Sequence, residues 1–134
     1  MSPRQVIAPP GWKAPSGYAH GVSVSGRVIA IAGQIGWNPR TGQFESDDFG
    51  EQTTQALKNI VEVLQAANAR PEHIVRLTWY ITDRDEYTKA RKAIGAAYKE
   101  IFGRYYPAMS VVVVSALLEA RAKVEIEATA VVSS

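Results

Sequence analysis

The feature that most constrains the fold is a strict alternation of apolar and polar side chains in residues 123–132. The apolar positions are Val124, Ile126, Ala128, Ala130 and Val132, and the polar ones are Lys123, Glu125, Glu127 and Thr129. Because successive side chains of a β-strand point to opposite faces of a sheet, this pattern predicts a strand with one apolar face. We expect that face to pack against helices and the polar row to lie on the other side of the sheet.

The rest of the chain contains the elements that such a strand needs as partners. Apolar residues at three- and four-residue spacing indicate helices, and runs of branched and aromatic residues indicate strands. In chain order we expect a hairpin over 21–33, a helix centred on 56–67, a strand at 74–81, a helix over 85–102, and strands at 110–114 and 122–132. This order favours one α+β domain over residues 1–134, with two helices on one face of a mixed sheet.

Local signals place the ends of these elements. Asp47 or Asp48 is expected to cap the first helix, and Gly103 to end the second. Gly95 lies inside the second helix, at a cost of about 1 kcal/mol relative to Ala. Residues 1–17, which are rich in proline and glycine, predict an irregular lead-in with a short edge strand at Val6–Ile7.

One face of the predicted sheet has no partner within the chain. Val111 to Val114 place apolar side chains on both faces of their strand, so both faces need cover. Two helices suffice for one face. We therefore expect the other face to meet a second subunit, with sites where subunits join.

Composition and charge exclude several classes of function. Apolar residues make up 46% of the 134 residues, charged residues 21%, and the net charge of +2 is dispersed, which argues against a nucleic-acid partner. The basic cluster from Lys89 to Lys92 has helical spacing, so a solvated helix face is favoured. The absence of cysteine excludes disulfides and thiolate chemistry, and no apolar run is long enough for a membrane span. A cytoplasmic protein is expected.

Glu125 is the strongest candidate for chemistry. It shares a strand face with Glu127, a like charge that raises a carboxyl pKa, and with Lys123, which lowers it. Such tuning suits a general acid/base that handles a water molecule. A cross-strand ladder of salt bridges at a subunit interface explains the same residues equally well. His20 and His73 lie in unrelated segments and predict no metal site.

A proline turn adjoins the penultimate strand and carries candidate substrate-binding residues. It reads Pro107-Ala108-Met109-Ser110 and follows Tyr105 and Tyr106. The tyrosines, with Tyr18, offer flat faces and hydroxyl donors to a conjugated substrate, although packing explains at least one of the adjacent pair. Met109 offers an apolar wall, or serves as an adaptable filler of the core.

These motifs together resemble the RidA/YjgF family of enamine and imine deaminases over nearly the whole chain. The matching segments are Ser16-Gly17-Tyr18, Ala32-Gly33-Gln34-Ile35, Asn38 to Gly42, Glu51-Gln52-Thr53, Leu57 to Ile60, Tyr98 to Phe102, Pro107-Ala108 and Val124 to Glu127. The resemblance implies a chorismate-mutase-like α+β fold, a homotrimer, and pockets for a small-molecule substrate between subunits. It also implies hydrolysis of reactive enamines or imines to a keto compound and ammonia, without a cofactor.

The resemblance also assigns roles to residues. Glu125 takes the role of activating water, Tyr18 lines the pocket, and Gly33 offers backbone contacts. Met109 stands where the family has an arginine that grips the substrate carboxylate, a contact that methionine cannot make.

The same comparison marks smaller departures and leaves the source of a replacement charge open. Gly95 replaces an asparagine of the family and Ala32 a serine. Arg104, Arg121 and Lys123 are candidates for a substitute cation. Two other functions stay open: a trimeric binding protein without catalysis, and an RNA-cleaving or translation-inhibiting protein.

Overall fold

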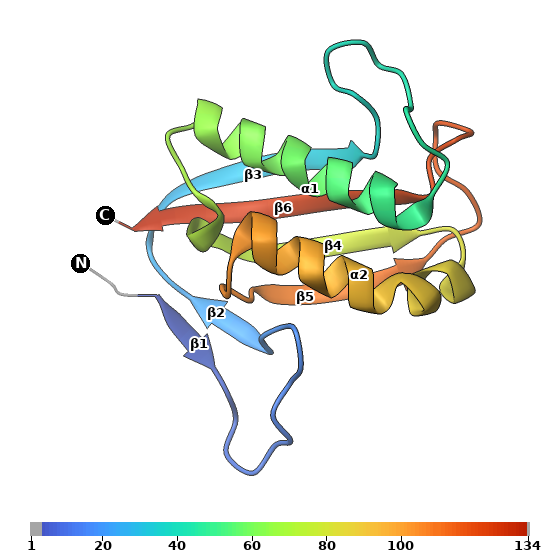
Figure 1. The fold of residues 1–134 in the computed structure, drawn as a ribbon. Helices are drawn as coiled ribbons and strands as arrows, with labels where there is room; N and C mark the ends of the chain where they lie inside the picture. The colour runs from blue at the N-terminus through green and yellow to red at the C-terminus, as the bar shows by residue number, and fades with distance from the viewer. Residues whose placement is uncertain (1–3, 134) are drawn as a thin grey trace.

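The computed structural model describes residues 4–133, which form two helices, six strands and one short 3-10 turn. The elements are β1 (Gln5–Ile7), β2 (Gly21–Ser23), β3 (Gly26–Ile35), α1 (Phe49–Ala66), η1 (Pro71–His73), β4 (Ile74–Ile81), α2 (Arg84–Phe102), β5 (Ala108–Val113) and β6 (Val124–Ser133). Figure 1 shows α1 and α2 side by side on one face of a four-stranded sheet. The expected α+β fold is confirmed.

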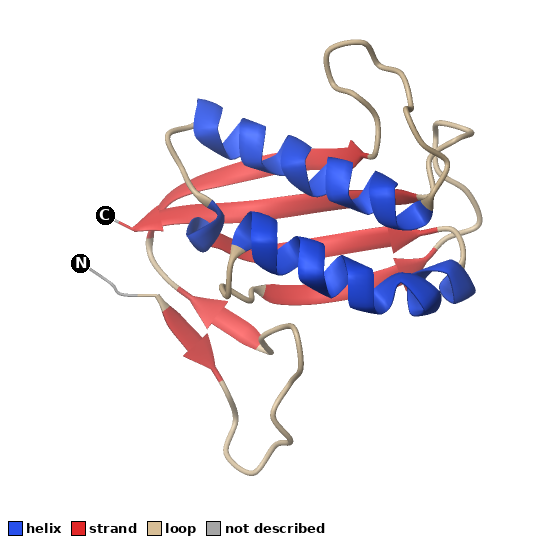
Figure 2. Cartoon of the chain, in the orientation of Figure 1, coloured by secondary structure: helices blue, strands red, loops and turns tan. Residues whose placement is uncertain are grey.

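The sheet is mixed, with strand order β3-β6-β4-β5. β6 runs antiparallel to both β3 and β4, whereas β4 and β5 are parallel and are joined by α2. Figure 2 shows that both helices lie on one side and that no described element covers the opposite face of this sheet. We call that opposite face the open sheet face.

The alternation in β6 is confirmed. Its apolar residues from Val124 to Ala130 are buried against the helices, and Glu125 and Glu127 are half-buried on the open sheet face. Leu77 and Trp79 of β4 lie opposite Ala128 and Ile126, so they belong to the same core layer. Together with the buried stripe of α1, these residues form one hydrophobic core between the sheet and the helices.

Both helices begin and end close to the expected residues. The Asp48 carboxylate accepts a hydrogen bond from the backbone N–H of Glu51 (2.9 Å), and Asp83 caps α2 in the same way through Glu86 (3.0 Å). α2 ends at Gly103, whose φ of 79° is a conformation that glycine adopts at little cost.

The predicted hairpin over 21–33 is wrong. β2 pairs with β1 in a separate two-stranded sheet, while β3 pairs with β6. Gly26 serves a different purpose from a hairpin turn. Its φ is +154°, and a Cβ there would collide with the carbonyl oxygen of Val132 on β6. The glycine therefore allows the start of β3 to approach β6 closely.

Two buried amide side chains hold the loops beside the core. Gln52, 1% exposed, donates to the carbonyls of Ser46 (3.1 Å) and Arg121 (3.0 Å) and accepts from the N–H of Lys123 (2.9 Å). Asn59 donates to the carbonyls of Ile35 and Trp37. Gln52 thus holds Lys123, the residue before the start of β6 and two residues before Glu125.

Neither described helix combines the length and the apolar character that crossing a bilayer requires.

Candidate functional site

A cavity of about 680 Å³ lies beside α2 and β5, within the size range of small-molecule sites. We call it the α2–β5 cavity. Its lining residues are Ser16, Gly17, Tyr18, Trp79, Tyr87, Arg91, Lys92, Ile94, Gly95, Ala96, Tyr98, Lys99, Tyr106, Met109 and Val111. Two of the predicted substrate-binding residues, Tyr18 and Met109, therefore lie in one cavity.

A backbone contact places Tyr18 next to the β5 strand. The N–H of Ala19 donates to the carbonyl of Pro107 (2.9 Å), and Ala19 forms an isolated parallel bridge with Ala108. Met109 lies opposite Leu77 of β4, and its side chain therefore points to the helix side of the sheet. The proline turn thus brings an apolar thioether, with no charge, to the wall of the cavity.

Of the two adjacent tyrosines, it is Tyr106 that lines the cavity. Its ring stacks on that of Tyr98, with 5.6 Å between centroids and 8° between planes. The Tyr98 hydroxyl donates to the backbone carbonyl of Tyr105 (3.0 Å), and burial raises the pKa of this phenol, so it stays a donor. Tyr105 is 48% exposed and is not among the lining residues, so its predicted contact with substrate stays a prediction.

Glu125 and Gly33 are brought together at a different place. β3 changes register between Ile31 and Gln34, so Ala32 and Gly33 together oppose Glu127 in a β-bulge. A Cβ on Gly33 would lie 2.7 Å from Cδ of Glu125, closer than such atoms approach. The glycine therefore leaves the space that the Glu125 carboxylate occupies over β3, on the open sheet face.

The neighbours of Glu125 are already engaged. The Tyr80 hydroxyl donates to Glu127 (2.8 Å), and this hydrogen bond is the main cause that raises the pKa of Tyr80. The Lys123 ammonium pairs with Glu86 (3.0 Å), so it does not stand as the counter-ion of Glu125. Among the described residues Glu125 has no hydrogen-bond or ion-pair partner, which leaves its carboxylate available to a ligand.

The sheet separates the two groups of predicted site residues. Met109 and Tyr18 line a cavity on the helix side, whereas Glu125 and Gly33 lie on the open sheet face. Within one chain they do not converge on a single ligand.

The cations near the α2–β5 cavity are not those suggested by sequence. Arg121 is held by Asp47 (2.9 Å), Lys123 is held by Glu86, and Arg104 is not among the lining residues. Instead the lining contains Arg91, Lys92 and Lys99 of α2. For Arg91 and Lys92 the sequence pattern favours a solvated helix face, and both side chains are exposed beside the cavity. Their helical spacing does not predict the cavity, because the cavity forms only when β5 and the loop between β1 and β2 pack beside α2.

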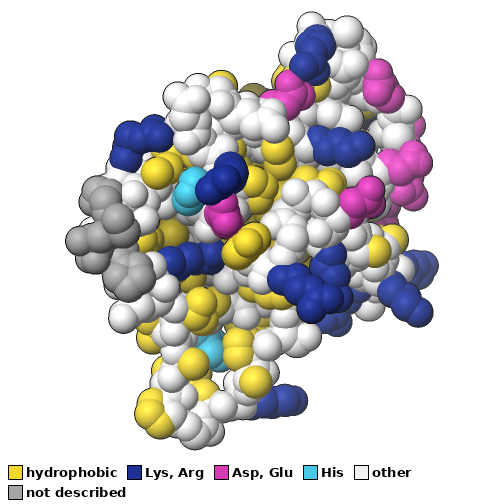
Figure 3. All heavy atoms as spheres, turned by 60° about the vertical axis from the view of Figure 1, so that its left-hand side comes forward, with side chains coloured by type: hydrophobic (Ala, Val, Ile, Leu, Met, Phe, Trp, Pro, Cys, Tyr) yellow, Lys and Arg dark blue, Asp and Glu magenta, His cyan; other side chains and the backbone are white. Residues whose placement is uncertain are grey.

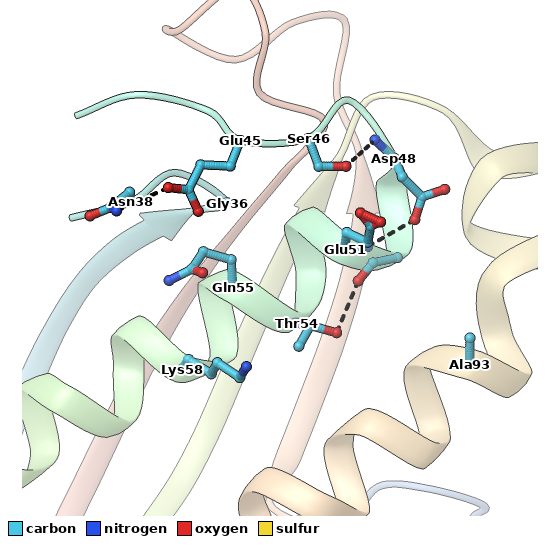
Figure 4. Close-up of a pocket in the computed structure, with 11 residues that line it drawn as sticks. Gly36, Asn38, Glu45, Ser46, Asp48, Glu51, Thr54, Gln55, Lys58 and Ala93 are labelled. Atoms are coloured by element: carbon cyan, nitrogen blue, oxygen red, sulfur yellow. Dashed lines mark hydrogen bonds between the residues drawn. The ribbon is translucent and has the colours of Figure 1, made fainter. Parts of the chain in front are cut away.

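A second hollow, the α1 cleft, has a different chemical character. Figure 4 shows it at the start of α1, with Asp48 at the helix cap and Glu45 next to Asn38. Its volume is about 440 Å³, and its charged lining is Glu45, Asp48, Glu51 and Lys58. Asp48 already caps the helix, and Glu45 accepts a hydrogen bond from the Asn38 side chain (3.2 Å). No group of three side chains in residues 4–133 is arranged to hold a metal ion.

Comparison with known proteins identifies related sequences and structures. The model of the family described as endoribonuclease L-PSP matches residues 11–132. A 2-iminobutanoate/2-iminopropanoate deaminase from Homo sapiens is 35% identical over 114 residues, which cover 85% of this chain and 79% of that protein. The deaminase of the same name from Dermatophagoides farinae is 33% identical over 133 residues, covering 98% and 99%. The crystal structure of YyfB from Yersinia pestis, a Rid-family protein of unknown function, superposes with a TM-score of 0.84 at 36% identity, covering 96% of this chain and 98% of that one.

Proposed function

Because the chain belongs to the endoribonuclease L-PSP family, which includes the YjgF/RidA proteins, we propose that it is an enamine/imine deaminase. In this reaction water adds to the carbon of a C=N bond to give a carbinolamine. Ammonia then leaves, and a keto compound remains. An enamine substrate first takes a proton on carbon to become the imine. No redox partner is needed for this balance.

The observation that carries the proposal is the unpartnered Glu125 carboxylate beside the Gly33 bulge. A carboxylate in this position can accept a proton from the attacking water and return it to the departing nitrogen. Tyr80 and Glu127 are occupied with each other at 2.8 Å, so Glu125 is the group free to move protons. We assign Glu125 as the general acid/base and Gly33 as the residue that leaves room for it.

A complete site needs a second copy of the chain. Tyr18 and Met109 lie on the helix side of the sheet, so a substrate in the α2–β5 cavity must meet Glu125 from another subunit. The open sheet face, which no described element covers, is a suitable contact surface for that subunit. We propose a homotrimer with one pocket in each cleft between copies.

Met109 alters which substrate the pocket accepts. An arginine grips a carboxylate with two charge-assisted hydrogen bonds. Loss of a hydrogen bond to a charged group costs about 1.5–3 kcal/mol, or roughly tenfold to over a hundredfold in binding. We therefore propose weak activity on small imino acids that depend on this contact.

Ammonia release from imines made in situ by amino-acid oxidases tests the function. We expect wild-type protein to accelerate release and Glu125→Ala to abolish that acceleration, because water activation is lost. Glu100→Gln, an exposed change on α2, is the matched control and should behave as wild type. Unchanged deamination by Glu125→Ala would show the assigned mechanism to be wrong.

Met109→Arg tests substrate recognition in the same assay. It should gain roughly tenfold or more on small carboxylate-bearing imines, by the hydrogen-bond energies above. If wild type and variant both leave every imine untouched but bind keto acids or aromatic amines in thermal-shift experiments, the chain is a binding protein instead.

A further inference from the structure

The charged lining of the α2–β5 cavity is entirely basic. Arg91, Lys92 and Lys99 contribute cations, and no carboxylate is among the lining residues. The α1 cleft differs, since three of its four charged residues are acidic. Figure 3 shows basic side chains on this face both among the acidic ones and below them, so the assignment of charge to each hollow comes from the lining residues. Basic side chains therefore line the α2–β5 cavity, and mainly acidic ones line the α1 cleft.

The α2 cations are also free to bind a ligand. Arg91, Lys92 and Lys99 form no salt bridge with any residue in the described part of the chain, whereas Arg121 and Lys123 are paired. Lys99 lies in the last turn, where the helix dipole favours a cation in any case. Arg91 lies in the middle of α2, where the helix dipole does not explain a cation. It is therefore the stronger indication of a ligand-binding role.

A bare segment of helix lies between two of these cations. Arg91, Gly95 and Lys99 follow one another at four-residue spacing and so lie on one stripe of α2, over about 12 Å along the axis. A Cβ placed on Gly95 would meet no atom within 4 Å. The glycine therefore leaves an open, flat floor with a cation one helical turn away on each side.

The other walls of the cavity are apolar and aromatic. Met109 and Val111 come from β5, Trp79 from β4, and Tyr18 from the N-terminal loop. Such walls suit a flat unsaturated group lying over Gly95. A guanidinium at the edge suits a carboxylate attached to that group.

We propose that the α2–β5 cavity takes an aromatic anion and that Arg91, supported by Lys99, binds its carboxylate. The cation missing at Met109 is thereby supplied from the neighbouring helix, in a different position. This inference uses the pocket assigned in the proposed function, and it names the substrate class as an imine that carries an aromatic group and a carboxylate. Arg91 and Lys99 are specificity-determining residues.

Binding of phenylacetate and of its uncharged isostere phenylacetamide, measured by titration calorimetry, tests the proposal without any turnover. Wild-type protein should bind phenylacetate at least about tenfold more tightly, by the energy of a charge-assisted hydrogen bond. The double variant Arg91→Gln/Lys99→Gln should lose this preference. The matched control Arg104→Gln/Lys89→Gln, which changes two basic residues outside the cavity lining, should keep it. Gly95→Leu, which fills the floor, should weaken both ligands.

Equal binding of the two ligands by wild type overturns the proposal, and so does a preference that survives in Arg91→Gln/Lys99→Gln. The proposed deaminase function is judged separately, by ammonia release. No ammonia release by any of these proteins, together with a preference for phenylacetate that is lost in Arg91→Gln/Lys99→Gln, refutes catalysis and supports the anion site. Deamination by wild type without a preference for phenylacetate refutes the anion site and supports the proposed catalysis.

Discussion

At the scale of the residue, Gly33 tests whether Glu125 must occupy its observed position. Gly33 has no positive φ, so its backbone accepts alanine, and the added Cβ meets mainly the flexible end of Glu125. We expect Gly33→Ala to turn the carboxylate away and to lower kcat/KM roughly tenfold to a hundredfold, the effect of a small misplacement of a catalytic group. Urea denaturation should show a change in unfolding free energy of about 1 kcal/mol or less, at the mild end of overpacking.

A double-mutant cycle separates this effect from general disturbance of the site. Because Glu125→Ala abolishes catalysis, the cycle is measured in unfolding free energy: in that background Gly33→Ala should cost no stability, since the side chain that its Cβ meets is already gone. Wild-type kcat/KM in the single Gly33→Ala variant would mean that the glycine is not needed to position the carboxylate.

At the scale of the element, Gly95 lowers the stability of α2 relative to alanine and leaves the floor of the α2–β5 cavity without a side chain. Replacing it with alanine should raise the unfolding free energy by about 0.5–1 kcal/mol, the difference between the two residues inside a helix. The open space around its Cβ position means that no steric term opposes this gain. The measurement is the midpoint of urea denaturation. The reverse change at an exposed position of the same helix, Ala93→Gly, should lower stability by a similar amount. A stability loss in Gly95→Ala would contradict the open floor.

The sequence predicts elements better than it predicts pairings. Periodicity identified both helices and β6, because each of these has one buried face that imposes a clear pattern, whereas runs of branched and aromatic residues identified β4 and β5. The pairing of β2 with β1 was missed, since a glycine before a branched run indicates both a turn and a close approach between strands. The role of Gly26 depends on the carbonyl of Val132, which is distant in sequence.

The candidate site shows the same division. Glu125, Gly33, Tyr18 and Met109 could be named from motifs, but their separation by the sheet follows only from strand register. The position of Arg91, Lys92 and Lys99 at the edge of the cavity could not be recognised from the sequence. An exposed lysine or arginine on an amphipathic helix has the same local pattern whether it faces solvent or the edge of a cavity.

At the scale of the whole molecule, the proposed function makes activity a property of an assembly, because the sheet separates the two halves of the proposed site within one chain. The proposed pocket takes Glu125 from one copy and the α2–β5 cavity from another. Two variants then inactivate different halves of the same site: Glu125→Ala removes the acid/base, and Gly95→Trp fills the cavity. Each variant alone should assemble and be inactive.

Mixing the two inactive variants by refolding in equal amounts should restore activity. In a cyclic trimer each cleft draws its two halves from different copies, so about one quarter of clefts combine two intact halves. We therefore expect roughly a quarter of wild-type ammonia release from the mixture and none from either variant refolded alone. Mass spectrometry of the intact assemblies confirms that mixed trimers form. If mixed trimers are present and stay inactive, Glu125 and the cavity of one chain serve the same site, and the proposed arrangement of subunits is wrong.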